Sequence, residues 1–298
     1  MRLVTFAKRG RPTPGVVSEA GDEIIDLSVV APRLAPDVLG IIEGGEKALA
    51  RVRQALKTRN KNARRPLSRV HLMAPIPVPR RNIMCVGKNY FDHAEEFHSS
   101  GFDASAGKAA IPDCPIFFTK GSTTVIGPGV PIPGSADATK SVDYEVELAV
   151  VIGRGGRRIA KRNAYGHVFG YTILNDVTSR YLQQRHKQWF LGKNLDGFCP
   201  MGPFLVTADE AGDVRKLRVQ TRVNGELRQD AAVKDLIFDI PTIIKTLSDV
   251  MTLLPGDIIA TGTPSGVGIG FSPPRFLRKG DVVALSISNL GTLENRVD

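Results

Sequence analysis

Apolar residues in this chain come mostly in short runs that end at glycine or proline, which is the pattern of β-strands. The runs that predict strands are 2–6, 15–17, 23–27, 83–86, 116–118, 145–152, 168–176, 204–206, 217–223, 257–260 and 282–287. Asn224-Gly225 follows one of these runs and predicts a tight hairpin turn, because both residue types accept a positive φ. The chain is therefore expected to be rich in antiparallel sheet.

Helical spacing of apolar residues is less common. It predicts one or two helices over 36–56, one that opens near Asp92, one from Thr178 to about Gln188, and one over about 241–249. Strands and helices do not alternate regularly, so we expect a mixed, β-rich α+β fold rather than a βαβ series. The proline-rich stretch 75–79 reads as a stiff connector, which predicts a small N-terminal α/β domain at 1–75 and a larger domain at 76–298.

The composition fits a globular protein of 298 residues with 42% hydrophobic residues. No apolar run approaches the roughly 18 residues that a membrane span needs, and the first residues lack the apolar core of a signal peptide. The three cysteines form no C-x-x-C pair, which argues against a disulfide framework and against a zinc site. We therefore expect a cytoplasmic protein that does not bind membranes.

The net charge of +10 raises the question of nucleic-acid binding. Residues 51–81 contain ten Lys and Arg and no Asp or Glu, so this segment carries the whole net charge. It contains no aromatic residue on which a base could stack. A solvated helix and linker is the preferred interpretation, and a non-catalytic polyanion-binding protein is the less favoured alternative.

Two glutamates on one apolar strand are the strongest chemical signal. Glu145 and Glu147 point to the same face, because side chains alternate along a strand. Neighbouring carboxylates on an apolar strand repel each other and resist desolvation, and a hard cation removes both problems. Asp176 ends the next long apolar run, and three acidic ligands without His or Cys favour Mg²⁺ or Mn²⁺. Taken alone, however, E-x-E fits a solvated sheet face better.

Other motifs change that balance. Arg180 and Gln183 follow Asp176 at i+4 and i+7, on one side of the predicted helix, and Arg180 is expected to hold Asp176 or a substrate carboxylate. His93 and Glu96 are three residues apart on a predicted helix, where a carboxylate raises the basicity of an imidazole. Each motif alone also fits a surface pair. The segment 99–110 is small and polar and predicts a mobile lid.

Two further segments complete the candidate site, and a third is excluded from it. Lys193 lies among aromatic and apolar residues, where it is expected either to stabilise an enolate or to pair with Asp196. Thr261 and Thr263 lie on a glycine-rich loop that lacks the Gly-Lys-Ser/Thr of a phosphate-binding loop, so we expect them to contact substrate oxygens. The segment 151–158 lacks the third glycine of a dinucleotide fingerprint.

Together these motifs resemble the fumarylacetoacetate hydrolase family, over roughly residue 83 to the C-terminus. The motifs that carry the resemblance are Val86-Gly87-x-Asn89-Tyr90-x-x-His93-x-x-Glu96, Asp143-Tyr144-Glu145-x-Glu147-Leu148, Asn175-Asp176-x-x-x-Arg180, Gly192-Lys193-x-x-Asp196, Gly262-Thr263-Pro264-x-Gly266-Val267-Gly268 and Leu277-x-x-Gly280-Asp281. The likeness is greatest to acylpyruvase and domain-2-like members. Lys88, Phe91 and the pair Asn194-Leu195 depart from the usual pattern.

The resemblance implies a catalytic β-roll, usually a homodimer, with Mg²⁺ or Mn²⁺ held by Glu145, Glu147 and Asp176. It also implies a catalytic His93–Glu96 dyad and a catalytic Lys193. The expected substrate contacts are Arg180, Gln183, Tyr90, Thr261 and Thr263.

The expected reaction is hydrolysis of a C–C bond in a 2,4-dioxo acid of the acylpyruvate or fumarylpyruvate type, which yields pyruvate and a carboxylic acid. Decarboxylation of oxaloacetate or another β-keto acid, and tautomerisation of a 2-oxo-3-enoate, use the same site and remain alternatives.

Overall fold

A large, mostly antiparallel sheet organises the computed structural model, which describes residues 1–103 and 109–298. Its strands follow the order β4-β3-β2-β1-β13-β11-β10-β16-β6-β7, with β5 beside β1 and β8 beside β13. They are β1 Arg2–Lys8, β2 Arg11–Val17, β3 Glu23–Asp26, β4 Arg64–Pro66, β5 Leu72–Met73, β6 Ile83–Gly87, β7 Ile116–Lys120, β8 Val125–Ile126, β10 Val146–Ile152, β11 Val168–Asn175, β13 Cys199–Thr207 and β16 Ile258–Ala260. The central strands are buried on both faces, which explains their continuous apolar runs.

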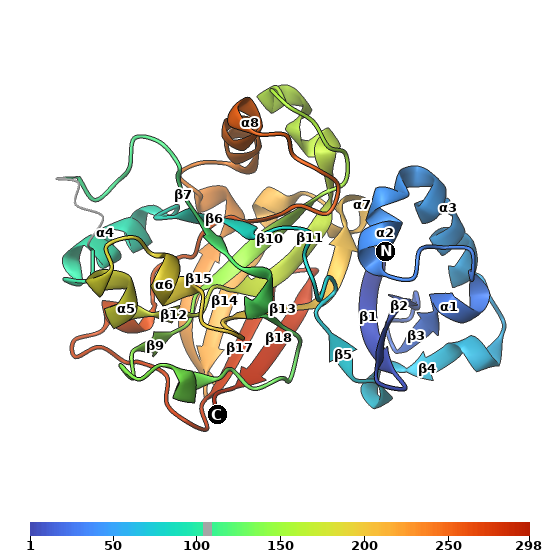
Figure 1. The fold of residues 1–298 in the computed structure, drawn as a ribbon, viewed down its shortest axis with the longest axis horizontal. Helices are drawn as coiled ribbons and strands as arrows, with labels where there is room; N and C mark the ends of the chain where they lie inside the picture. Colours follow the sequence, from blue (N-terminus) through green and yellow to red (C-terminus); the bar gives the residue numbers. More distant parts are fainter. Residues whose placement is uncertain (104–108) are drawn as a thin grey trace.

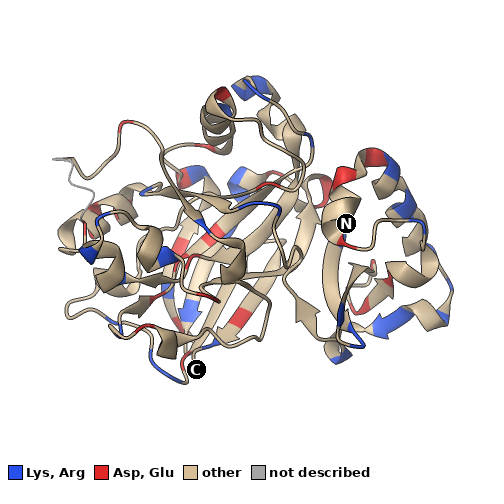
Figure 2. Ribbon diagram, viewed as in Figure 1, with Lys and Arg blue, Asp and Glu red and all other residues tan. Residues whose placement is uncertain are grey.

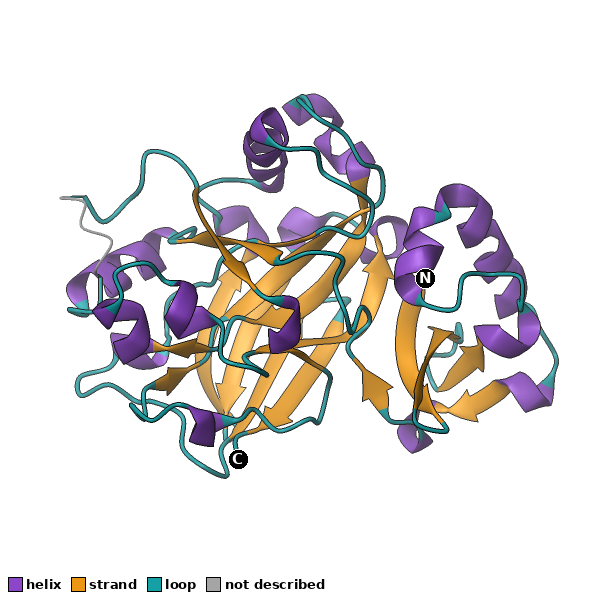
Figure 3. Ribbon diagram, in the orientation of Figure 1, coloured by secondary structure: helices purple, strands orange, loops and turns teal. Residues whose placement is uncertain are grey.

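Two smaller sheets complete the β structure. One pairs β9 (Val142–Asp143) with β12 (Thr178–Ser179), and the other has the order β15-β14-β17-β18. The strands of the second are β14 Arg218–Val223, β15 Glu226–Ala232, β17 Val282–Ile287 and β18 Gly291–Arg296. Apolar side chains of β10, β11, β14 and β17 share one core, so this sheet packs against the middle of the large one. Figure 3 shows these strands (orange) inside the larger part of the molecule.

Short helices surround the sheets. They are α1 Leu27–Val30, α2 Val38–Glu43, α3 Gly45–Leu56, α4 Phe91–Ser99, α5 Arg180–Arg185, α6 Phe190–Lys193, α7 Ala208–Ala211 and α8 Ile240–Val250. Helices α1 to α3 lie beside β1–β4 at one end of the molecule, and α4, α5 and α6 gather at the other (Figure 1). No helix within residues 1–103 and 109–298 combines the length and the apolar character that a membrane crossing requires.

The predicted α+β fold class is confirmed, and so is the hairpin between β14 and β15. Asn224 and Gly225 have φ values of 51° and 84°, as a tight two-residue turn requires. The predicted helix from Thr178 to Gln188 was wrong at both ends. Thr178 and Ser179 pair with β9, so the backbone stays extended and the helix begins only at Arg180.

The N-terminal strands continue the large sheet, because β1 pairs with β13 at Arg2↔Val206 and Leu3↔Leu205. The division into domains at 1–75 and 76–298 therefore stays a prediction. Figure 2 shows Lys and Arg (blue) along α3 and β4 of the N-terminal part. Several of these cations pair locally, as Arg64 does with Glu23 at 2.6 Å, which is consistent with a solvated basic surface.

Candidate active site

Four adjacent strands bring the predicted site residues together. The order β11-β10-β16-β6 places the end of β11, the start of β10, the loop after β16 and helix α4 after β6 beside one another. Glu147 lies on β10, Asp176 directly follows β11, and His93 lies on α4. The pairing Val146↔Asn175 between β10 and β11 sets Glu145 next to Asp176, across 31 positions of sequence.

The three carboxylates predicted as metal ligands form one buried cluster. Glu145, Glu147 and Asp176 each offer an oxygen atom, and these atoms lie within 4.8 Å of one another. All three residues are at most 4% exposed. A backbone hydrogen bond of 2.9 Å from Asp176 to Glu145 fixes the two segments in this register. The solvated sheet face considered for Glu145 and Glu147 is therefore wrong.

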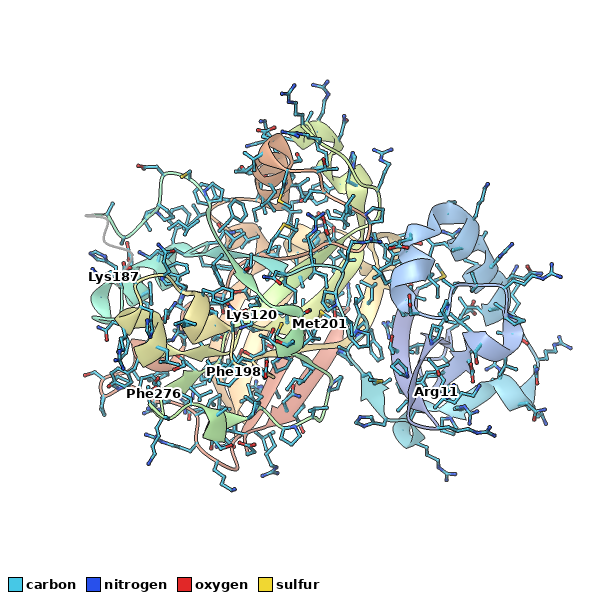
Figure 4. All side chains as sticks on the ribbon, viewed as in Figure 1. Arg11, Lys120, Lys187, Phe198, Met201 and Phe276 are labelled. Atoms are coloured by element: carbon cyan, nitrogen blue, oxygen red, sulfur yellow. The ribbon has the colours of Figure 1, made fainter. Side chains whose placement is uncertain are left out.

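Three buried cations neutralise part of this cluster. Lys193 Nζ lies 2.8 Å from Glu145 Oε2 and 2.7 Å from Asp176 Oδ2. Lys120 was not among the predicted site residues, but its ammonium lies 2.8 Å from Asp176 Oδ1, well inside the molecule (Figure 4). The local signal was a lysine two residues after the apolar run 116–118. Arg180 Nη1 lies 2.7 Å from Glu145 Oε1 and supplies the third cation.

The pKa values of Glu145 and Glu147 are shifted in opposite directions. Burial opposes ionisation of Glu145, but Lys193 and Arg180 outweigh it and lower its pKa to about 2. Burial and the nearby charges of Asp176 and Glu145 raise the pKa of Glu147 well above its usual range. Among the described residues, Glu147 accepts a hydrogen bond from the Gly262 N–H at 2.8 Å but forms no ion pair. The site thus lacks positive charge at Glu147.

That deficit fits a divalent metal ion. Carboxylate oxygens are the ligands that Mg²⁺ and Mn²⁺ prefer, and the described part of the cluster contains three of them without His or Cys. A metal cation bound here would also supply the positive charge that is missing beside Glu147. The acidic cluster is therefore chemically suited to the predicted metal.

Arg180 does not hold Asp176, which was one of its two predicted partners, and its contact with a substrate carboxylate stays a prediction. Its Nε donates to Asp143 Oδ2 at 2.9 Å and its Nη1 to Gln183 Oε1 at 3.2 Å, whereas Asp176 pairs with the two lysines. The reason is the late start of α5, which directs Arg180 toward β9. Asp143 also accepts hydrogen bonds from two backbone N–H groups of the glycine-rich loop, at Gly268 and Ile269.

The predicted dyad is present on α4. His93 Nδ1 lies 3.2 Å from Glu96 Oε2, and the other oxygen of Glu96 accepts a hydrogen bond from the Gly266 N–H at 2.9 Å. Gly270 leaves room for this contact, because a Cβ atom there would lie 1.9 Å from Glu96. The glycine-rich loop therefore orients Glu96, which in turn orients the imidazole.

A cavity of about 20 Å³ joins the dyad to the carboxylates, and it has room for about one water molecule. Its lining residues are Val86, Gly87, Lys88, His93, Phe97, Phe118, Glu145, Glu147, Arg180, Gln183, Trp189, Lys193 and Thr263. A four-carbon acid is larger, so its binding requires some of these side chains to shift.

Two predicted substrate contacts do not line this cavity. Thr261 donates its hydroxyl to the Leu148 carbonyl at 2.9 Å, and Tyr90 forms a β-bridge with Leu236. Their contact with substrate stays a prediction. Lys193 pairs with the carboxylates, and no Lys193–Asp196 pair occurs in the described part of the chain. The predicted lid at 99–110 includes residues 104–108, which lie outside the described residues.

Comparison with known proteins supports the same reading. A family model described as fumarylacetoacetate (FAA) hydrolase C-terminal matches residues 82–298. The chain is 52% identical to oxaloacetate tautomerase YisK of Bacillus subtilis (strain 168) over 309 residues, covering 100% of both chains.

Solved structures are also similar. A fumarylacetoacetate hydrolase from the psychrophilic Exiguobacterium antarcticum has a TM-score of 0.83 and 43% identity, with coverage of 100% of this chain and 99% of that one. Maleylpyruvate hydrolase from Sphingobium sp. SYK-6, in complex with manganese(II) and pyruvate, has a TM-score of 0.77 and 33% identity, with coverage of 100% and 98%. The resemblance seen in the sequence is confirmed, and the chain belongs to the fumarylacetoacetate hydrolase family.

Proposed function

We propose that this enzyme is a metal-dependent tautomerase that interconverts the enol and keto forms of oxaloacetate. The observation that carries the proposal is the placement of a His–Glu dyad and a buried lysine around one small cavity that three carboxylates also line or adjoin. A tautomerase needs a group that removes a proton from carbon and a group that stabilises the enolate oxygen. The site contains both.

Glu145, Glu147 and Asp176 would hold Mg²⁺ or Mn²⁺, which when bound supplies Lewis acidity toward the 2-oxo oxygen of the substrate. The chain's own residues complete the charge pattern. Arg180 and Lys193 keep Glu145 ionised, and Lys120 and Lys193 hold Asp176 in place. These contacts fix the carboxylates before any ligand arrives, which avoids reorganisation during the reaction.

In the proposed proton transfer, His93 accepts a proton from C3 of keto-oxaloacetate. Glu96 lies at Nδ1, so Nε2 is the nitrogen that acts as the base. The electron pair of the broken C3–H bond forms the C2–C3 double bond, and the 2-oxo oxygen becomes an enolate. Lys193 donates a hydrogen bond to that oxygen and then a proton; His93 afterwards releases its proton to solvent and Lys193 takes one up, so that both residues return to their starting charges. The reverse sequence gives the keto form, and no atom is lost or gained.

This proposal replaces C–C hydrolysis as the preferred reaction. The relative with 52% identity is an oxaloacetate tautomerase, and the alignment covers the whole length of both chains. That finding supports the two alternatives considered from the sequence. The proposal takes its substrate, oxaloacetate, from the decarboxylation alternative and its reaction type, tautomerisation, from the 2-oxo-3-enoate alternative.

Hydrolysis of a 2,4-dioxo acid remains the second candidate. The His93–Glu96 dyad is equally suited to deprotonate a water molecule, and one similar solved structure is a maleylpyruvate hydrolase with manganese and pyruvate bound. In that reaction the three carboxylates would hold the same metal ion, and Lys193 would donate a hydrogen bond to the departing pyruvate enolate.

The test follows enol-oxaloacetate with purified protein, in Mg²⁺ and in EDTA. Loss of the enol's ultraviolet absorbance measures ketonisation, and malate dehydrogenase with NADH reports the keto form as it arises. We expect Mg²⁺-dependent acceleration over buffer that disappears in Glu147→Gln, a variant of equal size. A ketonisation rate with protein and Mg²⁺ that equals the rate in buffer would overturn the proposal.

Parallel reactions separate the alternatives. Pyruvate formed from oxaloacetate indicates a decarboxylase, and acetate plus pyruvate formed from acetylpyruvate indicates a hydrolase. The expected homodimer is a separate prediction, which light scattering on the purified protein tests.

A further inference from the structure

Lys88 is a buried lysine that lines the cavity, and it has no role in the proposed proton transfer. It is 5% exposed and lines the cavity together with His93. Its φ of 53° lies in the left-handed region, which is strained for any residue with a side chain. Strand β6 ends at the preceding residue, Gly87, and α4 begins at Phe91, so Lys88 lies where the chain turns from the sheet to the dyad helix.

A row of aromatic rings separates Lys88 from the carboxylate cluster. Lys88 Nζ lies 5.4 Å from the centroid of the Phe97 ring, and Lys193 Nζ lies 5.1 Å from that of Phe118. Trp189 lies between the two rings, with centroid distances of 5.9 Å to Phe97 and 5.3 Å to Phe118. The two lysines therefore occupy opposite ends of one aromatic wall.

The cations at the carboxylate end are already paired. Arg180 contacts Asp143 and Glu145, and Lys193 contacts Glu145 and Asp176. Lys88 differs from both. Its ammonium has three N–H donors, and the described residues supply it with one acceptor, Asp103 Oδ2 at 2.5 Å, and the face of Phe97. Donors therefore remain for a further acceptor.

We propose that Lys88 binds the second carboxylate of the substrate, so that the site selects 2-oxo dicarboxylates over 2-oxo monocarboxylates. The inference rests on the proposed function, because it places the 2-oxo acid group of the substrate at the carboxylate cluster. The rest of the substrate then extends along the aromatic wall, where burial of an unpaired carboxylate is unfavourable. A charge-assisted hydrogen bond from Lys88 removes that penalty.

Asp103 is then a competitor for the same ammonium. Its carboxylate is buried beside Lys88, with 6% of the side chain exposed, and it neutralises the lysine in the ligand-free protein. The substrate carboxylate shares or takes over this role. This makes the two members of the pair unequal: loss of Lys88 weakens diacid binding, whereas loss of the Asp103 charge does not.

The test measures binding of malate and lactate by calorimetry at saturating Mg²⁺. These unreactive 2-hydroxy acids differ in the second carboxylate alone. In Lys88→Met we expect malate affinity to fall by roughly 10- to 150-fold, the range for a lost hydrogen bond to a charged group, while lactate affinity stays unchanged. Unchanged lactate and Mg²⁺ affinities show that the variant is folded. Lys88→Arg keeps the charge and retains most of the preference for malate.

Asp103→Asn separates substrate binding from a structural ion pair. We expect malate affinity equal to or tighter than in the unmodified protein, because Lys88 loses a competitor. If both variants lower malate and lactate affinity alike, Lys88 and Asp103 form a structural pair and the inference is wrong. The malate-to-lactate ratio is read without turnover, so absence of tautomerase activity would overturn the proposed function alone.

Discussion

Two charged regions of this molecule differ in how they hold their charges. Around the cavity, Lys120, Lys193 and Arg180 are at most 2% exposed and contact carboxylates from distant parts of the chain. In the basic segment 51–81, pairs such as Arg64–Glu23 are about one-third exposed. Water screens the second kind of pair and is excluded from the first.

Net charge is a poor guide to the location of the candidate site in this protein. The basic segment accounts for the whole charge of +10, yet its charges are solvated. The buried cluster contains acids and bases in similar numbers, so it is almost invisible in the composition. Charge that has been removed from water is the better indicator of chemistry.

The largest expected effect is on turnover, and it comes from a substitution of Glu147, the carboxylate of the cluster that forms no ion pair among the described residues. Glu147→Gln preserves volume but removes a predicted metal ligand, and we expect turnover of enol-oxaloacetate to fall by at least about 100-fold. Calorimetry with Mn²⁺ should show weakened binding. Glu226→Gln, on the exposed β14–β15 hairpin, is the control. If both variants bound Mn²⁺ normally, the buried cluster would have no special role.

A second prediction concerns the dyad. His93→Ala removes the proposed base, so we expect turnover to fall by about 10²- to 10⁴-fold. The affinity for Mn²⁺ should stay unchanged, because His93 is not a predicted ligand. Glu95→Ala, an exposed residue on the same helix, tests for general damage to α4. Retained turnover in His93→Ala would assign the proton transfer to another group.

Replacement of Lys120 tests how much a buried ion pair contributes to the free energy of unfolding. Lys120→Met leaves Asp176 with one cation fewer in a buried site, and we expect the free energy of unfolding to fall by about 3–5 kcal/mol. Urea denaturation measures this change. The matched variant Lys47→Met, at an exposed position of α3, should stay within about 0.5 kcal/mol of the parent. Equal stability of the two variants would contradict the assigned ion pair.

The smallest effect is expected in the basic segment. Arg64→Met breaks the pair with Glu23, which is about one-third exposed, and we expect less than about 1 kcal/mol of lost stability in the same urea experiment. High salt should reduce the difference further, because it screens exposed charges. A loss as large as that of Lys120→Met would remove the distinction between the two regions.

Much of this site could be predicted because its signals are local. Alternation along a strand placed Glu145 and Glu147 on one face, and the i,i+3 spacing paired His93 with Glu96. Asp176 was also a candidate, as the acid that ends the next apolar run, but its contact with Glu145 depends on the pairing of β10 with β11.

The rest depends on contacts between distant segments, which local patterns do not contain. Lys120 reaches Asp176 from β7, where its ammonium also donates to the backbone carbonyls of Val177 and Lys193. Arg180 turns to Asp143 because β12 pairs with β9, and this pairing also overrode the helical pattern over 178–179. Propensity gives way to tertiary pairing at such positions.

The cavity beside the carboxylates has room for about one water molecule. Hydrolysis of a C–C bond consumes one water in each turnover, whereas tautomerisation consumes none. A ligand that filled this space would keep the groups proposed for proton transfer and would exclude the second reactant of hydrolysis. Side-chain volume at Phe118 or Trp189 would then select between two reactions that share the same catalytic residues, so solvent exclusion, rather than new chemistry, would separate a tautomerase from a hydrolase.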